Sequence, residues 1–342
     1  MSAQTAQRRV KQSKDRIIST RELSLLAVLA LIVLAIQFRN STFLSSRSIN
    51  DMLKNYATTI TLSLGMMSVL LVGGIDISVS ATLAFSGMAA SLLMRDGYYT
   101  STLVMFLLST AIGTVCGLLV GLVISRGKVL PIIATLGFAN IYRGATYLIS
   151  DNRWVSAYQF DAAFKKFAQS KTLTFGLLNN LVFIALVCYA VFFVLMRWTR
   201  FGRRIYAVGS NPEAAAISGI NIRRVQLVVY TMAGAFAGLV GAMYTSLYAS
   251  AQSDMGTGME MDAIAACVLG GVSLSGGQGG VPGVLLGALT MTVISKALPL
   301  IGISQFWQKA IKGAIILIAI IINVLAQRAI RRNDLKAREL QL

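Results

Sequence analysis

Apolar stretches long enough to cross a lipid bilayer recur along almost the whole of this 342-residue sequence. A membrane-spanning α-helix needs about 20 mostly apolar residues, within a range of roughly 17–25. The pattern predicts an all-α, polytopic membrane protein with about ten transmembrane helices. We expect these spans at residues 23–38, 56–75, 78–94, 103–125, 129–149, 176–196, 225–247, 262–274, 281–298 and 308–326. Span 262–274 is short and ends at two glycines, which fits a broken or partly inserted helix.

The composition agrees with a lipid environment. Hydrophobic residues make up 56% of the chain and charged residues 13%, against roughly 25% charged residues in soluble domains. The net charge of +18 does not indicate a nucleic-acid partner, because lysines and arginines cluster at the ends of apolar runs. That is where they are expected in a membrane protein whose cytoplasmic segments are basic.

The distribution of basic residues also predicts the orientation. With ten crossings and a cytoplasmic N-terminus, inside segments hold 19 lysines and arginines and outside segments hold 8. This ratio places both termini in the cytoplasm. We therefore expect a basic cytoplasmic N-terminal tail at 1–22, a transmembrane domain at 23–326 with a cytoplasmic loop at 197–224, and a cytoplasmic C-terminal tail at 327–342.

The residues that could drive transport or catalysis are sparse. The chain has no histidine, and none of its 13 acidic residues falls between residues 97 and 150, 162 and 212, or 263 and 333. A proton-coupled transporter usually needs such a group inside the membrane. Cys116, Cys188 and Cys267 stand alone in apolar runs, so we expect no metal site. A secondary transporter and an intramembrane enzyme are both disfavoured, and no catalytic residue is expected.

The cytoplasmic loop carries the signals of a short helix. Asn211 is a good N-cap, Pro212 suits the first helical position, and Glu213 complements the positive helix start. Gly219 then ends the helix. Two interpretations are open: a surface turn, or a peg that docks a cytoplasmic partner. The candidate docking residues are Gly209, Asn211, Pro212, Glu213, Ala214, Ala215 and Gly219.

Several motifs carry a family resemblance. Glu213-Ala214-Ala215, followed by Gly219, resembles the first half of the Glu-Ala-Ala loop of bacterial ATP-binding-cassette importer permeases, although the later Ile-x-Leu-Pro half is absent. Four further motifs resemble ribose-type sugar permeases in order and spacing, with Ser80 where the family usually has Gly. They lie at 74–79, at 134–136 with Arg143-Gly144, at 199–203 and at 256–266.

This resemblance implies the setting in which the protein works. Such permeases form dimers, as a homodimer or with a close paralogue, in the bacterial inner membrane. Two cytoplasmic ATPases bind ATP and magnesium, so no cofactor is expected in this chain. A periplasmic or tethered binding protein delivers the substrate, here ribose or a related pentose or hexose. The alternative is a branched-chain amino-acid importer of the same superfamily.

One further motif resembles a part of the ATPase subunits and not of the permeases. Leu274-Ser275-Gly276-Gly277-Gln278 spells the signature of the ATPase subunits themselves. That signature functions with a phosphate-binding G-x-x-x-x-G-K-[ST] loop, which this sequence lacks. We therefore predict that 274–280 is a glycine-rich turn between spans.

The transport pathway is predicted only in outline. Arg143 is the one charge well inside a long span, and it either serves the pathway or reaches to the outer interface. Glycines repeat every four residues at 113, 117 and 121, and again at 234 and 238, which favours close helix packing within one subunit over a dimer seam. The candidate pathway or gate residues are Asp76, Asn140, Arg143, Gln252, Glu260 and Asp262.

Overall fold

The computed structural model describes residues 20–300, together with 302–304, 307–308, 310–314, 317–318 and 321. Over these residues the protein is helical, apart from loops and an isolated antiparallel bridge between Val155 and Ala251. The elements are α2 (Thr20–Arg39), α3 (Ser46–Leu71), α4 (Val79–Arg95), α5 (Thr102–Gly127), α6 (Pro131–Ser150), η1 (Ala157–Gln159), α7 (Ala162–Phe167), η2 (Thr172–Thr174), α8 (Asn180–Trp198), α9 (Arg200–Ser210), α10 (Pro212–Ile217), α11 (Ile222–Tyr248), α12 (Met259–Leu269) and α13 (Val281–Leu300).

The all-helical class predicted from the sequence is confirmed for these residues. Five described helices, α2, α5, α8, α11 and α13, are long and apolar enough to cross a membrane. Each of the first nine expected spans falls on a helix, and most of the tenth, at 308–326, lies outside the described residues, as do the tails before residue 20 and after residue 326. The number of crossings and the side of each terminus stay predictions.

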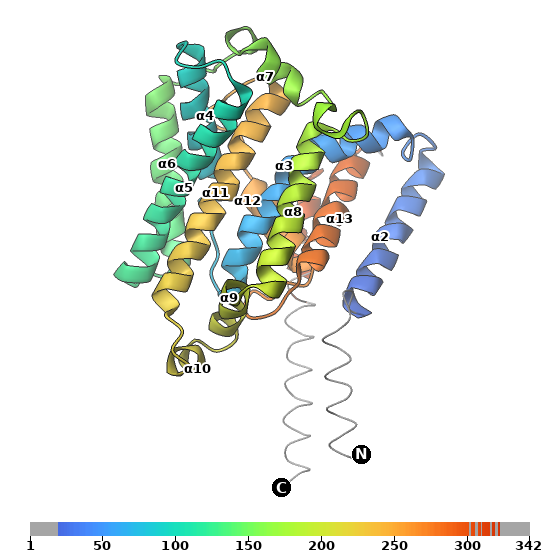
Figure 1. Cartoon of the computed structure of the whole chain (residues 1–342). Helices are drawn as coiled ribbons and strands as arrows, with labels where there is room; N and C mark the ends of the chain where they lie inside the picture. The colour runs from blue at the N-terminus through green and yellow to red at the C-terminus, as the bar shows by residue number, and fades with distance from the viewer. Residues whose placement is uncertain are drawn as a thin grey trace.

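The helices form a bundle with two distinct ends (Figure 1). The short helices α9 and α10 lie at one end, and α7 lies at the other. Helix α11 is central, because it packs against α5, α3 and α4. Helix α2 stands at the edge of the bundle beside α13.

Glycines allow the closest of these contacts. A side chain at Gly113 would overlap the carbonyl oxygen of Gly234, and one at Gly238 would overlap that of Ser109. The Ser109 hydroxyl also donates a hydrogen bond of 2.6 Å to the Gly238 carbonyl. The glycine repeats thus join α5 to α11 inside the subunit, which confirms the packing predicted from their spacing.

Helix α12 is too short to span the bilayer. Its 11 residues rise about 16 Å, roughly half of a hydrocarbon core. It runs from Met259 to Leu269 and ends at Gly270, so the expected span at 262–274 is not one continuous spanning helix. Its partial insertion in the membrane stays a prediction. The non-helical segment 249–258 leads into it.

The segment 150–175 carries both exposed and buried aromatic residues. Trp154 and Tyr158 are exposed. Phe160 and Phe164, however, are buried. Phe164 packs against Phe106 and Phe160, so the loop closes one end of the bundle.

Candidate functional site

Helix α10 forms as its capping residues predict. The Asn211 side chain accepts a hydrogen bond of 3.0 Å from the backbone N–H of Ala214, and Pro212 takes the first helical position. At the other end Gly219 has φ +79°, a left-handed conformation that suits glycine. The N–H of Ile220 then donates to the Ala215 carbonyl at 3.0 Å, which completes the helix end.

The surface of α10 is almost entirely open to solvent. Of its residues only Ala215 is buried, whereas the Ile217 side chain is 89% exposed. A groove of about 770 Å³ lies beside it, lined in part by Lys128, Gly219 and Arg223. Glu213, Ile217 and this groove together place acidic, apolar and basic groups close to one another on the surface. Sequence analysis did not single out Ile217, because isolated apolar residues in loops are common.

Helix α9 connects this surface to the bundle through backbone contacts. A side chain at Gly209 would overlap the carbonyl oxygen of Leu71 at the end of α3, and Gly277 lies against Ser210. The Gly277 N–H donates a hydrogen bond of 2.9 Å to the same Leu71 carbonyl. We call this meeting of residues 71–74, 206–210 and 273–279 the glycine crossing.

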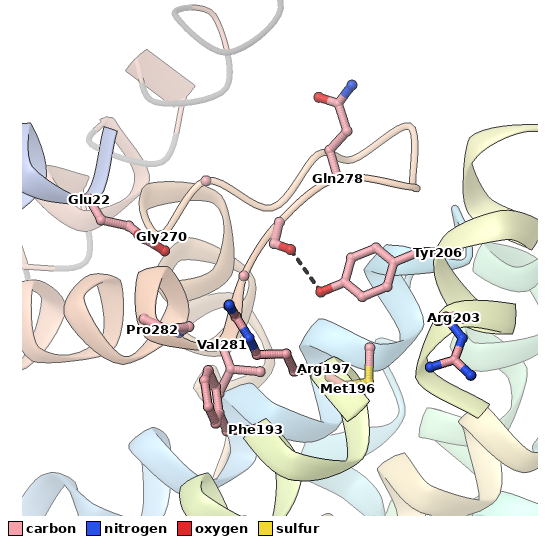
Figure 2. Close-up of a pocket in the computed structure, with 13 residues that line it drawn as sticks. Glu22, Phe193, Met196, Arg197, Arg203, Tyr206, Gly270, Gln278, Val281 and Pro282 are labelled. Carbon is pink, nitrogen blue, oxygen red and sulfur yellow. Dashed lines mark hydrogen bonds between the residues drawn. The ribbon is translucent and has the colours of Figure 1, made fainter. Parts of the chain in front are cut away.

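The glycine crossing includes the motif that resembled an ATPase signature. Residues 274–280 are a turn between α12 and α13, as predicted. The Tyr206 hydroxyl donates a hydrogen bond of 2.8 Å to the Gly279 carbonyl (Figure 2). Burial raises the pKa of Tyr206 to about 12, so this hydroxyl keeps its proton near neutral pH. The turn therefore fastens α9 to the start of α13.

The candidate pathway residue Arg143 supports irregular backbone. Its guanidinium donates to the carbonyl oxygens of Ser253 at 2.7 Å and Met255 at 3.1 Å. Both residues belong to the non-helical segment before α12 and are buried. Such backbone is stable at membrane depth only when its polar groups are paired inside the protein. Arg143 supplies that pairing, a role that neither sequence interpretation included.

Two other candidates lie at the start of α12. The Glu260 carboxylate accepts a hydrogen bond of 3.1 Å from the Gly258 N–H and is within electrostatic reach of Arg143. Asp262 forms an ion pair of 3.0 Å with Lys312, which ties α12 to the helical residues 310–314. Gln252 lies half-buried in the preceding segment. The structure thus gathers Arg143, Gln252 and Glu260 around one irregular segment.

Asp76 lies apart from these residues, in the link between α3 and α4. It is 2% exposed, and its Oδ1 accepts hydrogen bonds from the Ser78 N–H at 2.8 Å and hydroxyl at 2.6 Å. Nearby, the buried Tyr230 hydroxyl touches Gly74 and has no hydrogen-bond partner among the described residues. Sequence analysis missed Tyr230, since nothing in its own sequence neighbourhood marks it.

Asn140 lies on the uncovered face of α6. Its amide donates to the Leu136 carbonyl at 3.0 Å, and the side chain is exposed. Gly137 and Gly144 share this face, and a Cβ at either glycine would meet no atom within 4 Å. An amide that faces lipid is costly, so on a membrane-spanning α6 this face would require cover by water or protein.

Comparison with known proteins identifies the relatives. The family described as "Branched-chain amino acid transport system / permease component" matches residues 48–320. The ribose import permease protein RbsC of Bacillus subtilis is 36% identical, over 86% of this chain and 90% of its own length. The galactose/methyl galactoside import permease protein MglC of Escherichia coli K12 is also 36% identical, over 88% of this chain and 92% of its own length. No solved structure shows a significant match.

Proposed function

This chain belongs to the family of branched-chain amino acid transport system permease components, and on that premise we propose that it is the membrane-spanning permease of an ATP-driven importer for a simple sugar. Partner ATPases hydrolyse the ATP, and an extracytoplasmic binding protein delivers the sugar. The end of the bundle that carries α9 and α10 faces the cytoplasm, in agreement with the count of basic residues.

The observation that carries this proposal is the construction of α10. It is a capped helix that exposes Glu213 and Ile217, and it directly follows α9, which the glycine crossing ties to the end of α3 and to the turn before α13. A partner that moves α10 and α9 therefore also moves the end of α3 through backbone contacts, and the turn before α13 through Gly277 and the Tyr206–Gly279 hydrogen bond. This is what a coupling element requires.

The sugar is favoured over an amino acid by the names of the relatives. The family description names branched-chain amino acids, whereas relatives that align over most of this chain are named for ribose and galactose. We propose a pentose or hexose as the substrate. Uptake of radiolabelled ribose and galactose, with leucine as competitor, tests the assignment, and inhibition by leucine alone would reverse it.

The transport pathway follows the uncovered face of α6. We assign Asn140 to its lining, and we place a second permease subunit, a homodimer partner or a close paralogue, opposite this face, which also bears Gly137 and Gly144. Arg143, Gln252, Glu260 and Asp262 shape the gate around the segment before α12. Asp76 belongs to the inner end, where the α3–α4 link meets the glycine crossing.

Co-purification tests docking directly. The permease is expressed together with its ATPase and its binding protein in bacterial inner membranes. We expect the ATPase to co-purify with the wild-type permease and not with an Ile217→Asp variant, because the charge would be buried in the contact. Matched substitution of the exposed Leu177 at the opposite end by Asp should leave the complex intact. Equal recovery of ATPase with both variants would refute docking through α10.

A further inference from the structure

A pocket of about 510 Å³ opens where three long helices begin or end (Figure 2). Glu22 comes from the first turns of α2, Arg197 from the last turn of α8, and Pro282 from the first turn of α13. Each of these helices is apolar enough to cross the membrane. The exposed Trp198 at the end of α8 is a residue type that concentrates at the membrane–water interface. The pocket therefore lies at the level of the lipid headgroups.

The pocket carries more positive than negative charge. Arg197 and Arg203 both line it, and Glu22 is the acidic residue in its lining. Among the described residues neither guanidinium forms an ion pair. Arg197 lies over the Phe193 ring at 5.8 Å, and Arg203 donates to the Trp198 carbonyl at 3.3 Å. Both groups retain donors for an anion, and a guanidinium fits phosphate in a two-pronged geometry.

Part of the remaining lining is apolar. Phe193, Met196 and Val281 line the pocket beneath Arg197. Figure 1 shows α13 between α8 and α2, and Leu186, which lies on the same stripe of α8 as Phe193 and Arg197, is exposed. The arginines thus lie where the anionic headgroup of a lipid would be, and the apolar surface lies where its acyl chains would be.

We propose that this pocket binds a membrane glycerophospholipid, with its phosphate on Arg197 and its acyl chains along the surface between α8 and α2. Arg203 adds positive charge at the α9 side of the headgroup. The Tyr206–Gly279 hydrogen bond forms the wall between the pocket and the glycine crossing, so the lipid contacts the same turn that fastens α9 to α13. This inference does not depend on which solute the protein transports.

Native mass spectrometry of the purified full-length chain, in mild detergent, measures the bound lipid. We expect phospholipid to remain on the wild type and Arg197→Gln to lower its retention about tenfold, because one charge-assisted contact is lost. Arg197→Lys should retain an intermediate amount. Glu22→Gln should raise retention, since it removes the opposing carboxylate. Arg223→Gln, in the groove on the other side of α10, is the matched control and should match the wild type.

A thermal shift series identifies the source of the phosphate. Short-chain phosphatidylglycerol should raise the melting temperature of the wild type and not of Arg197→Gln. Inorganic phosphate at equal concentration should leave the melting temperature of both proteins unchanged. Stabilisation by inorganic phosphate alone would overturn the lipid assignment. Equal lipid retention by Arg197→Gln and the wild type would also overturn it. If Arg197→Gln in addition lost ATPase binding, the occupant of the pocket would be a segment of the ATPase.

Discussion

Replacing Gly209 by alanine should separate α9 from α3 at the glycine crossing and so weaken the coupling between sugar transport and ATP hydrolysis. The new methyl group would overlap the Leu71 carbonyl oxygen and lie 2.5 Å from the Gly277 nitrogen. Both obstacles are backbone atoms, which cannot rotate away. Overpacking of this kind costs about 1–3 kcal/mol, and losing the Gly277–Leu71 hydrogen bond adds about 0.5–1.5 kcal/mol. We expect α9 to separate from α3 at a local cost of about 2–4 kcal/mol.

The assay compares this variant with two glycine-to-alanine variants that are destabilised by backbone conformation and not by overlap with neighbouring atoms. Gly219→Ala and Gly97→Ala both place alanine at positive φ, but their new methyl groups meet no atom within 4 Å. Each should cost about 1–2 kcal/mol of local conformational strain. Membrane abundance should stay near wild type for all three. Sugar-stimulated ATP hydrolysis should fall at least about tenfold in Gly209→Ala, because about 1.4 kcal/mol corresponds to a factor of ten. Sugar-stimulated ATP hydrolysis at the wild-type rate in Gly209→Ala would refute the idea that the glycine crossing transmits movement from α9 to the bundle.

Three further substitutions probe other parts of the account. Glu213→Lys should insert normally but lose co-purification of the ATPase, because it opposes the dipole of α10 and changes the docking surface; full co-purification would contradict this. Tyr230→Phe should raise the melting temperature, since it removes a buried hydroxyl without a partner at a gain of about 1 kcal/mol, and a lower melting temperature would count against that. Arg143→Leu should lower protein yield and melting temperature, because it leaves the Ser253 and Met255 carbonyls unpaired at about 1–3 kcal/mol each, whereas unchanged values would show that this pairing is dispensable.

The sequence predicted the helices well where apolar residues decide the structure. Helix α5, expected at 103–125, runs from Thr102 to Gly127. Helix α3, expected from residue 56, begins at Ser46, where the Ser45 side chain caps it. Its first turns are polar, and a count of apolar residues cannot detect them. The same limit applies to the amphipathic α9, which the sequence analysis treated as part of a loop.

Helix α10 was predictable because its signals are local. Asn211, Pro212 and Gly219 lie within nine residues, and each has a specific effect on a helix end. The glycine crossing was not predictable in this way. Leu71, Gly209 and Gly277 are far apart in sequence, and only the fold brings their backbones together. The ion pair between Asp262 and Lys312 was missed for the same reason.

Reconstituted transport tests the central proposal most directly. The permease is placed in proteoliposomes with its ATPase and binding protein, with ATP on the side of α10 and labelled ribose or galactose on the other. We predict that uptake requires ATP, the ATPase and the binding protein, and that a proton uncoupler leaves it unchanged. Uptake by the permease alone that an uncoupler abolishes would contradict the account and identify a secondary transporter.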